Sequence, residues 1–462
     1  MYDYHSLLYG VRVSAGVFMK AIKICPVNDR TNGWSQLLPA RTPNAPLQKD
    51  IKADWVVVGA GLAGLAAARR LAENCPDDTI VLLEADEVGE GAQGRNSGFA
   101  IDIPHNVGSS MDEIAQGQRH LRLARYAIES LQEQVEKHHI ECDWDQAGKF
   151  HAAVSAKGVE QILRPTLAML QSLKEPNEWL EGAALHEKIG FDHFRAAIYT
   201  PGTVLLNPAA LTRGLAAHLP QNVHLFEHTP VIRWDAEQST GTHPIVLRTP
   251  NGQVQARKMV LTVNVFAGQF GFYKQQIIPL AAHASLTRPL TPAEQEKLPG
   301  LSSWGLTPAN AFVGITMRRT ADQRILIRQN IRYEPKLHAS DEERARARKE
   351  HQKLFDERFP SLSGVTMEHT WTGFICVSQN GAPGFGQVAS NVYSAVCQNG
   401  VGLTKGTVGG LLIADLATGR ENALVGDMLA LGEPTQLPPR PFLDWGVRAR
   451  FAWELWSARA EA

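Results

Sequence analysis

The segment from Trp55 to Glu84 constrains the fold of this chain more than any other part of its sequence. A short β-branched run at residues 55–58 leads into a glycine-rich turn at 59–64, and helix-forming residues follow at 65–73. A second apolar run, residues 79–83, ends in an acid, Glu84. Buried parallel strands have continuous apolar sequences, so we expect strand, glycine turn, helix and parallel strand within about 30 residues. The segment therefore predicts an α/β fold built on a Rossmann-like parallel sheet.

The three glycines of this turn have distinct roles in a dinucleotide site. Gly59 permits the tight turn, Gly61 lets a pyrophosphate approach the backbone, and Gly64 lets helix and strand pack closely. The N-terminus of the helix would present free N–H groups to the phosphate, and Glu84 stands where an acid binds ribose hydroxyls. The alternative is a glycine turn in an ordinary α/β unit. The acid favours FAD or NAD over NADP. The predicted cofactor-binding residues here are Gly59, Gly61, Leu62, Ala63, Gly64, Glu84 and Ala85.

A second glycine-rich loop at residues 89–98 decides between the two dinucleotides. Its glycines, arginine, asparagine and serine can run close along a flavin and donate to its polar edge, whereas a nicotinamide enzyme needs no such loop there. The alternative is a flexible surface loop, because the same residue types are common in loops. The residues predicted to contact the cofactor from this loop are Gly91, Ala92, Arg95, Asn96, Ser97 and Gly98.

The overall composition excludes several classes of protein. With 46 basic and 47 acidic residues the net charge is −1, which disfavours a nucleic-acid partner. The five cysteines form no CxxC pair and no metal-finger spacing, so we expect reduced thiols, no metal site and a cytoplasmic enzyme. We identify no run long enough to span a bilayer and no clear signal peptide. Aromatic and arginine residues at 442–460 predict a helix that packs across the chain's own domains, with membrane docking as the alternative.

The remaining elements are read from hydrophobic runs and turn signals. Residues 1–50 are expected to form an irregular arm. Helices are expected at 114–137, 340–355, 407–418 and 442–460. Strands are expected at 223–231, 245–248, near Val254, and at 258–264 and 392–396, with a hairpin turn at 249–252.

Four motifs in order give the chain a family resemblance. Residues 91–98 read GAQGRNSG, residues 371–373 and 382–386 read WTG and APGFG, and Gly400-Val401-Gly402 precedes a small-residue helix. A turn at residues 319–324 is the fourth. The chain resembles the FAD-dependent D-amino-acid oxidase superfamily, in its glycine/sarcosine oxidase and gamma-glutamylputrescine oxidoreductase branch. Val401 stands where the family usually has histidine.

The resemblance implies two domains resembling those of p-hydroxybenzoate hydroxylase. An FAD-binding domain would comprise residues 51–110, 195–272 and 366–425, and a substrate domain residues 111–194 and 273–365, with a mixed antiparallel sheet and helices. Residues 426–462 would form a proline-rich segment and helix. The overall class is then α+β, with FAD held non-covalently, because the segment around Cys376 better matches the non-covalent, putrescine-type enzymes. The implied cofactor-binding residues from these parts are Val231, at the adenine, and Gly400, Val401, Gly402, Leu403 and Thr404.

The implied reaction is oxidation of the C–N bond of an amine or amino acid. A hydride equivalent passes to flavin N5, water hydrolyses the imine, and oxygen reoxidises the flavin with release of hydrogen peroxide. The alternatives are an amine dehydrogenase with a quinone or protein acceptor, a flavin-binding subunit of a hetero-oligomer, and a nucleic-acid modifying enzyme, which the neutral charge disfavours. Backbone N–H groups after Gly400 would stabilise negative charge on the flavin.

Substrate contacts are read from single residues. Arg328, on an apolar strand, would bind a substrate carboxylate bidentately, unless it points to an exposed face of the sheet. Lys405 would aid oxygen reduction by its charge, with a solvated helix lysine as the alternative. His105 and His283 are candidate bases, although a lone histidine is more often structural, and Trp371 is expected in the core rather than in a substrate cage.

Overall fold

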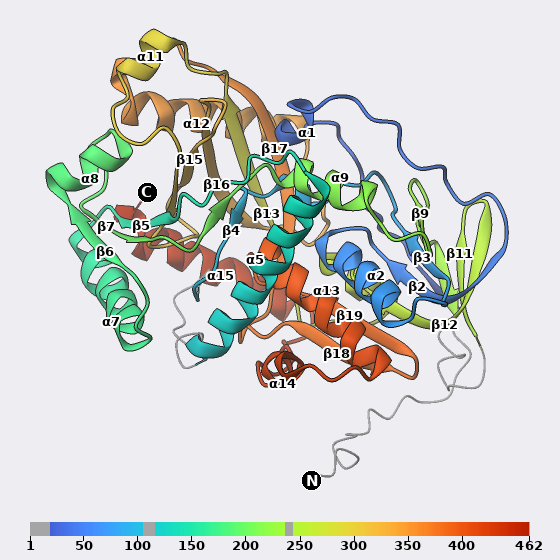
Figure 1. Cartoon of the computed structure of the whole chain (residues 1–462). Helices are drawn as coiled ribbons and strands as arrows, with labels where there is room; N and C mark the ends of the chain where they lie inside the picture. Colours follow the sequence, from blue (N-terminus) through green and yellow to red (C-terminus); the bar gives the residue numbers. More distant parts are fainter. Residues whose placement is uncertain (1–18, 105–115, 236–243, 462) are drawn as a thin grey trace.

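Two large sheets organise the protein (Figure 1). The computed structural model describes residues 19–104, 116–235 and 244–461. Within them the chain forms a nine-stranded sheet, an eight-stranded sheet and a two-stranded ladder of β4 (Phe99–Ala100) and β8 (Val204–Leu205). The predicted class, a parallel Rossmann-like sheet combined with a mostly antiparallel sheet and helices, is confirmed.

The nine-stranded sheet has a parallel centre and antiparallel flanks. Its order is β1-β10-β11-β12-β2-β3-β9, with β19 beside β12 and β18 beside β19. The parallel strands are β2 (Ile51–Val58), β3 (Ile80–Leu83), β9 (Val223–Phe226), β12 (Gly252–Leu261) and β19 (Val392–Val396). The flanking strands are β1 (Met19–Ala21), β10 (Arg233–Asp235), β11 (Ile245–Thr249) and β18 (Gly384–Ala389).

Both faces of this sheet are covered, which explains the continuous apolar sequence of β2. Val57 joins the hydrophobic cluster that also contains residues of α2 (Leu62–Asn74), α5 (Gly117–His138) and α13 (Gly402–Thr418). Val56 and Val58 point the other way and join a second cluster with Trp234. The predicted helix and strands of this first unit are therefore confirmed, together with their parallel pairing.

Three strand predictions in this sheet need correction. The strand expected at 223–231 ends at Phe226, because the chain turns at His228, whose φ is +48°, and Thr229 N–H then bonds to the Glu84 carbonyl at 2.8 Å. The two strands expected near Val254 and at 258–264 are the single strand β12. The hairpin turn at 249–252 is confirmed by the pairing of its end residues.

The eight-stranded sheet is the second large sheet of the molecule, and its strand order is β17-β13-β16-β15-β14-β5-β7-β6. Its first half consists of β17 (Met367–Val377), β13 (Ile278–Thr287), β16 (Ile325–Tyr333) and β15 (Thr316–Arg319). Its second half consists of β14 (Trp304–Pro308), β5 (Lys149–Ala153), β7 (Ala196–Thr200) and β6 (Glu178–Glu181). Strands β7 and β17 both belong to this sheet, although both fall in segments predicted for the FAD-binding domain. The domain boundaries stay a proposal, with these strands as exceptions.

The predicted helices form, with shifted ends, except that the expected start of the first helix at residue 114 lies outside the described residues. Helix α13 begins at Gly402 rather than at 407, so the glycine turn opens the helix directly. Helix α12 (Asp341–Arg358) begins with a capping box at Ser340. The remaining helices are α1 (Gly33–Gln36), α3 (Ala92–Arg95), α6 (Ala156–Gly158), α7 (Arg164–Ser172), α8 (Gly182–Ile189), α9 (Pro208–Ala217), α10 (Ala267–Phe270), α11 (Pro292–Glu296), α14 (Ala423–Leu429) and α15 (Phe442–Ser457).

Helix α15 packs on the chain itself, as expected, with one face only. Leu443 and Val447 are buried in a cluster with Leu280 and Tyr333 of the antiparallel sheet. Other large side chains of this helix are exposed, including Trp456 at 67%. Among the described residues, no helix is long and apolar enough to cross a membrane.

Candidate functional site

The turn after β2 forms a cradle that excludes side chains. Gly59 has φ +97°, a backbone conformation that favours glycine, and its N–H bonds to the Leu83 carbonyl at 2.8 Å. A Cβ on Gly64 would lie 1.8 Å from the Gly59 carbonyl oxygen, so only glycine lets α2 start this close to the strand. The first N–H groups of α2 have no intrahelical partner, because they precede its first turn. This backbone is therefore shaped to receive phosphate oxygens.

The second loop repeats the construction of the first. Residues 89–94 read GEGAQG, the same glycine spacing as residues 59–64, and a Cβ on Gly94 would again lie 1.8 Å from a carbonyl oxygen, that of Gly89. The two turns face each other, because a Cβ on Gly61 would lie 3.2 Å from the side-chain oxygen of Gln93. This repeat of the glycine spacing is visible in the sequence, but the prediction used the spacing of the first turn alone.

A cavity of about 280 Å³ lies between these turns. Gly59, Gly61 and Glu84 line it from the first unit, and Arg95 lines it from the second loop. Leu62 and Ala63 are buried beneath in the core, so they can offer only their backbone to a ligand. Of the other predicted contacts, the cavity lining includes Ala85, Gly91, Ala92 and Val231.

Glu84 both lines the cavity and stabilises the turn. Its carboxylate accepts hydrogen bonds from Ala60 N–H at 2.9 Å and Asp86 N–H at 3.1 Å. Burial raises the pKa of Glu84, and the two backbone bonds oppose that shift. The acid thus connects the end of β3 with the start of the phosphate turn, at the place where a ribose would be recognised.

A second cavity, of about 120 Å³, adjoins the first through Ala92 and Arg95, which line both. Asn96 and Ser97 line it from the second loop, while Gly98, with φ +78°, lies behind them against Leu206 and Arg318. The other predicted residues in its lining are Gly400, Val401, Gly402, Leu403 and Arg328. Residues separated by more than 200 positions thus meet at one cavity.

The N-terminus of α13 is presented to this second cavity. Gly400 has φ +80°, and Gly402 is the first residue of the 17-residue helix. The N–H groups of Gly402, Leu403 and Thr404 precede the first intrahelical bond, which Lys405 N–H donates to the Val401 carbonyl at 3.1 Å. Thr404, whose buried hydroxyl has no hydrogen-bond partner, does not line this cavity. The helix therefore offers partial positive charge and free donors at the cavity wall.

Arg328 enters the same cavity from β16. One guanidinium nitrogen donates to the Ala311 carbonyl at 3.2 Å and another to the Thr316 hydroxyl at 2.5 Å. No carboxylate of the described residues forms an ion pair with it. Burial lowers the pKa of Arg328 to about 10. A half-buried cation held only by neutral oxygens favours an anionic ligand.

The other candidates lie apart from these two cavities. Lys405 lines a small third cavity with His120, so the structure does not place it beside Arg328. His283 is buried between Thr372 and Arg332, and burial lowers its pKa to about 4, which matches the structural alternative. His105 lies outside the described residues.

Trp371 and Cys376 of β17 also line neither cavity. Trp371 is fully buried, as expected, and its indole N–H donates to the Arg95 carbonyl at 2.8 Å. Cys376 is buried, its thiol lies 3.3 Å from the Asn264 side-chain oxygen, and burial beside Cys397 raises its pKa. These surroundings favour the non-covalent alternative for the cofactor.

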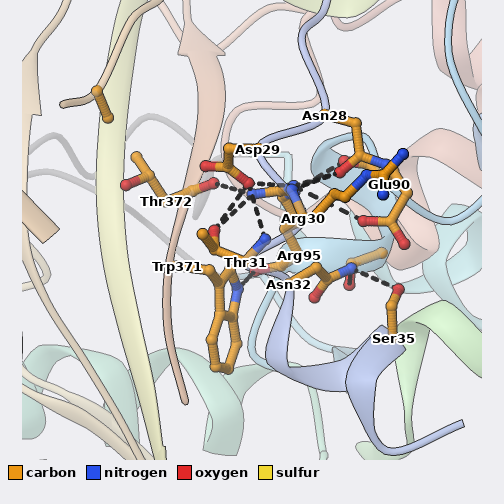
Figure 2. Close-up of polar contacts among 12 residues, drawn as sticks. Asn28, Asp29, Arg30, Thr31, Asn32, Ser35, Glu90, Arg95, Trp371 and Thr372 are labelled. Carbon is orange, nitrogen blue, oxygen red and sulfur yellow. Dashed lines mark hydrogen bonds and ion pairs between the residues drawn. The ribbon is translucent and has the colours of Figure 1, made fainter. Parts of the chain in front are cut away.

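The residues that sequence reasoning missed belong to the N-terminal arm. Residues 22, 24–27 and 29 form part of the lining of the larger cavity, and Arg344 of α12 lines it as well. Figure 2 shows Asp29, Asn32 and Arg95 in one polar cluster with Trp371 and Thr372 of β17. The arm follows no repeating pattern, so no signal in its sequence predicted this position.

Comparison with known proteins identifies the family. The profile of the FAD-dependent oxidoreductase (DAO) family matches residues 54–416. The chain belongs to this family. It is 27% identical to gamma-glutamylputrescine oxidoreductase of Escherichia coli over 396 residues, which cover 82% of this chain and 86% of that protein. It is 23% identical to the probable oxidoreductase OrdL of Haemophilus influenzae, with the same coverage.

Solved structures agree on the fold. Glycine oxidase from Geobacillus kaustophilus superimposes with a TM-score of 0.67 at 19% identity, covering 84% of this chain and all of that one. L-proline dehydrogenase from P. horikoshii gives a TM-score of 0.65 at 17% identity, with 85% and 98% coverage. The family resemblance drawn from the four motifs is confirmed.

The cofactor of this FAD-dependent family fits the residues present. The larger cavity has two side-chain-free turns for a diphosphate and an acid at the end of β3 for a ribose. The smaller cavity has free N–H groups of α13 for the polar edge of a flavin. The two cavities adjoin, which suits one extended molecule that carries both groups.

Proposed function

We propose that this protein oxidises the C–N bond of a small amine that carries a carboxylate, an amino acid being the simplest example. The observation that supports this most directly is Arg328 in the cavity that also receives the N-terminus of α13. A guanidinium without an acidic partner selects a carboxylate, and bidentate bonding fixes the orientation of the substrate. Glycine oxidase, a structural neighbour, is named for such a substrate.

The rest of the cavity wall suits a small substrate. Ala282, Ala284 and Ala311 line it beside Ile331 and Ile375, so the carbon skeleton of the substrate would lie against apolar groups. Such a lining excludes water and favours the neutral form of an amine over its ammonium form. Arg328 would hold the carboxylate at one side, which leaves the carbon next to the nitrogen to face the flavin.

The chemistry that bound FAD supplies is a two-electron oxidation of the carbon next to nitrogen, which leaves an imine for water to hydrolyse. The N–H groups of Gly402, Leu403 and Thr404 would stabilise the negative charge that accompanies reduction. Oxygen would be the acceptor, with hydrogen peroxide as product. A dehydrogenase with a quinone or protein acceptor is the second candidate, because the structural neighbours include L-proline dehydrogenase. Five free cysteines suit a cytoplasmic enzyme.

An anaerobic absorbance titration tests the proposal. The FAD-loaded protein would be mixed with matched pairs that differ in one carboxylate: glycine and methylamine, alanine and ethylamine, gamma-glutamylputrescine and 4-aminobutanoylputrescine. We expect the flavin band to bleach with a carboxylate-bearing member and to recover, with peroxide, when air is admitted. Recovery only with an added quinone would favour the dehydrogenase. A band that bleaches equally with both members of every pair would contradict the role of Arg328.

A variant of Arg328 makes the test specific. Arg328→Lys keeps the charge but loses the bidentate geometry, so we expect kcat/KM to fall about 10- to 100-fold for carboxylate substrates. Activity on the matched amine should not change. Arg332→Lys is the control, because Arg332 lies on the same strand, pairs with Glu343 at 2.8 Å and lines neither cavity. Equal losses in both variants would indicate damage to the strand instead.

A further inference from the structure

The N-terminal arm precedes the segment that the family profile matches, yet it forms part of the cofactor cavity. Residues 22, 24–27 and 29 line the larger cavity together with residues of both glycine turns. The family match begins at residue 54. This wall is therefore made by residues outside the segment that the family profile matches.

The arm is anchored on both sides of the stretch that lines the cavity. Before it, β1 pairs with β10, and Ile22 N–H donates to the Ile232 carbonyl at 3.0 Å. After it, the Asn32 side chain donates to the carbonyls of Gly89 and Gly94, both at 3.1 Å. These two carbonyls belong to the second glycine turn, so the arm fixes the loop that adjoins both cavities.

Trp34 and Arg41 extend the second anchor. The Trp34 indole donates to the Asn96 carbonyl at 2.8 Å, and its ring is 1% exposed. Arg41 forms an ion pair with the buried Glu227, which also accepts a hydrogen bond from Val88 N–H at 2.7 Å. The blue segment in Figure 1 follows this course, from α1 along the outer side of the parallel sheet.

Asp29 occupies the centre of the wall and joins two parts of the protein. Its carboxylate lies 2.7 Å from a guanidinium nitrogen of Arg95 in the second loop and 3.1 Å from one of Arg344 in α12 (Figure 2 shows the first contact). All three residues line the cavity. Thr31 also donates to Asp29, through its hydroxyl at 2.7 Å. Burial tends to raise the pKa of Asp29, but Arg95 and Thr31 bring it below its ordinary value.

We propose that residues 22–32 are the retaining wall of the FAD site, and that Asp29 keeps this wall closed by joining Arg95 to Arg344. A dinucleotide in the larger cavity is then held by the arm as well as by the glycine turns. Release of FAD requires the Asp29 contacts to open, and bound FAD in turn holds the arm in place. This proposal depends on the family's cofactor and not on the amine chemistry, so either can fail without the other.

The rate of FAD release tests the wall. Asp29→Asn keeps the shape of the side chain and removes its charge, and Arg344→Gln removes one of its two partners. Loss of charged hydrogen bonds at a partly buried site should speed FAD release about tenfold or more, followed by the fluorescence of freed flavin. Limited proteolysis of the wild-type protein tests the wall without any variant, because trypsin can cleave after Lys23 and Arg30, which are exposed within the arm. We expect cleavage there to slow about tenfold when FAD is bound.

Asp427→Asn is the matched control for these variants. Asp427 also joins two arginines, Arg119 at 3.6 Å and Arg122 at 2.8 Å, and its side chain is 18% exposed against 23% for Asp29. It lines neither cavity. We expect its FAD release to stay within about twofold of the wild type, because neither Asp427 nor its two arginines line the larger cavity.

Two results would overturn the proposal. One is release of FAD at the wild-type rate from both Asp29→Asn and Arg344→Gln, provided that both proteins fold and bind the cofactor. The other is tryptic cleavage after Lys23 and Arg30 at the same rate with and without FAD. If the variants fail to fold, the tryptic comparison on the wild-type protein decides alone.

Discussion

Replacing Gly64 by alanine should weaken the binding of FAD and leave the protein folded. The added Cβ would lie 1.8 Å from the Gly59 carbonyl oxygen, whereas real Cβ atoms keep at least 3.0 Å, so the start of α2 must shift by about 1.2 Å. A shift of this size breaks hydrogen bonds from the turn to a phosphate. Each charged hydrogen bond contributes about 1.5–3 kcal/mol, so we expect FAD affinity to fall about 10- to 150-fold for each bond lost.

The assay is titration of the apoprotein with FAD, followed by quenching of flavin fluorescence, with thermal unfolding as the check on folding. Gly94→Ala is a second variant with the same 1.8 Å overlap in the other turn, and it should weaken binding in the same way. Gly268→Ala is the control, because a Cβ there meets nothing within 4 Å. Folded Gly64→Ala and Gly94→Ala proteins that bind FAD within about threefold of the wild type would refute the reasoning.

Two further predictions concern stability and the mode of cofactor binding. Burial lowers the pKa of His283 from its usual 6.5 to about 4, so between these two pH values the unfolded chain binds a proton on this imidazole and the folded protein does not. The stability that the neutral imidazole contributes is therefore fully present above pH 6.5 and falls by about 3 kcal/mol as the pH drops through 4. In denaturant unfolding, the free energy of unfolding of His283→Gln should depend less on pH than that of the wild type. The control is His224→Gln, because His224 is exposed. A pH dependence equal to that of the wild type in His283→Gln would contradict the role given to His283. Acid precipitation should release FAD from the wild type and from Cys376→Ser alike, because Cys376 lines neither cavity; yellow colour retained in the wild-type pellet and lost in the variant would show a covalent link.

Some parts of the two cavities are encoded by neighbouring residues, and others depend on contacts between residues far apart in the chain. The glycine turn at 59–64 is encoded locally, since a positive φ at Gly59 and a close approach at Gly64 each need a residue without a side chain. Helix α2 and strand β3 follow from the helix-forming and apolar residues of their own segments. Strand β9 was predicted too long, because its end depends on a backbone bond from Thr229 to Glu84, the residue that follows β3.

The sequence by itself determined the parallel unit, the two glycine turns, the acid at the end of β3 and the family, because each depends on short spacings that restrict the backbone. The tertiary structure decided that Arg328 lines the cavity that receives the N-terminus of α13, since the direction of a side chain on a strand depends on pairing with distant strands. It also placed the arm over the cofactor cavity. Asp29, Arg95 and Arg344 lie far apart in the chain, and an ion pair between such residues leaves no periodic trace in the sequence.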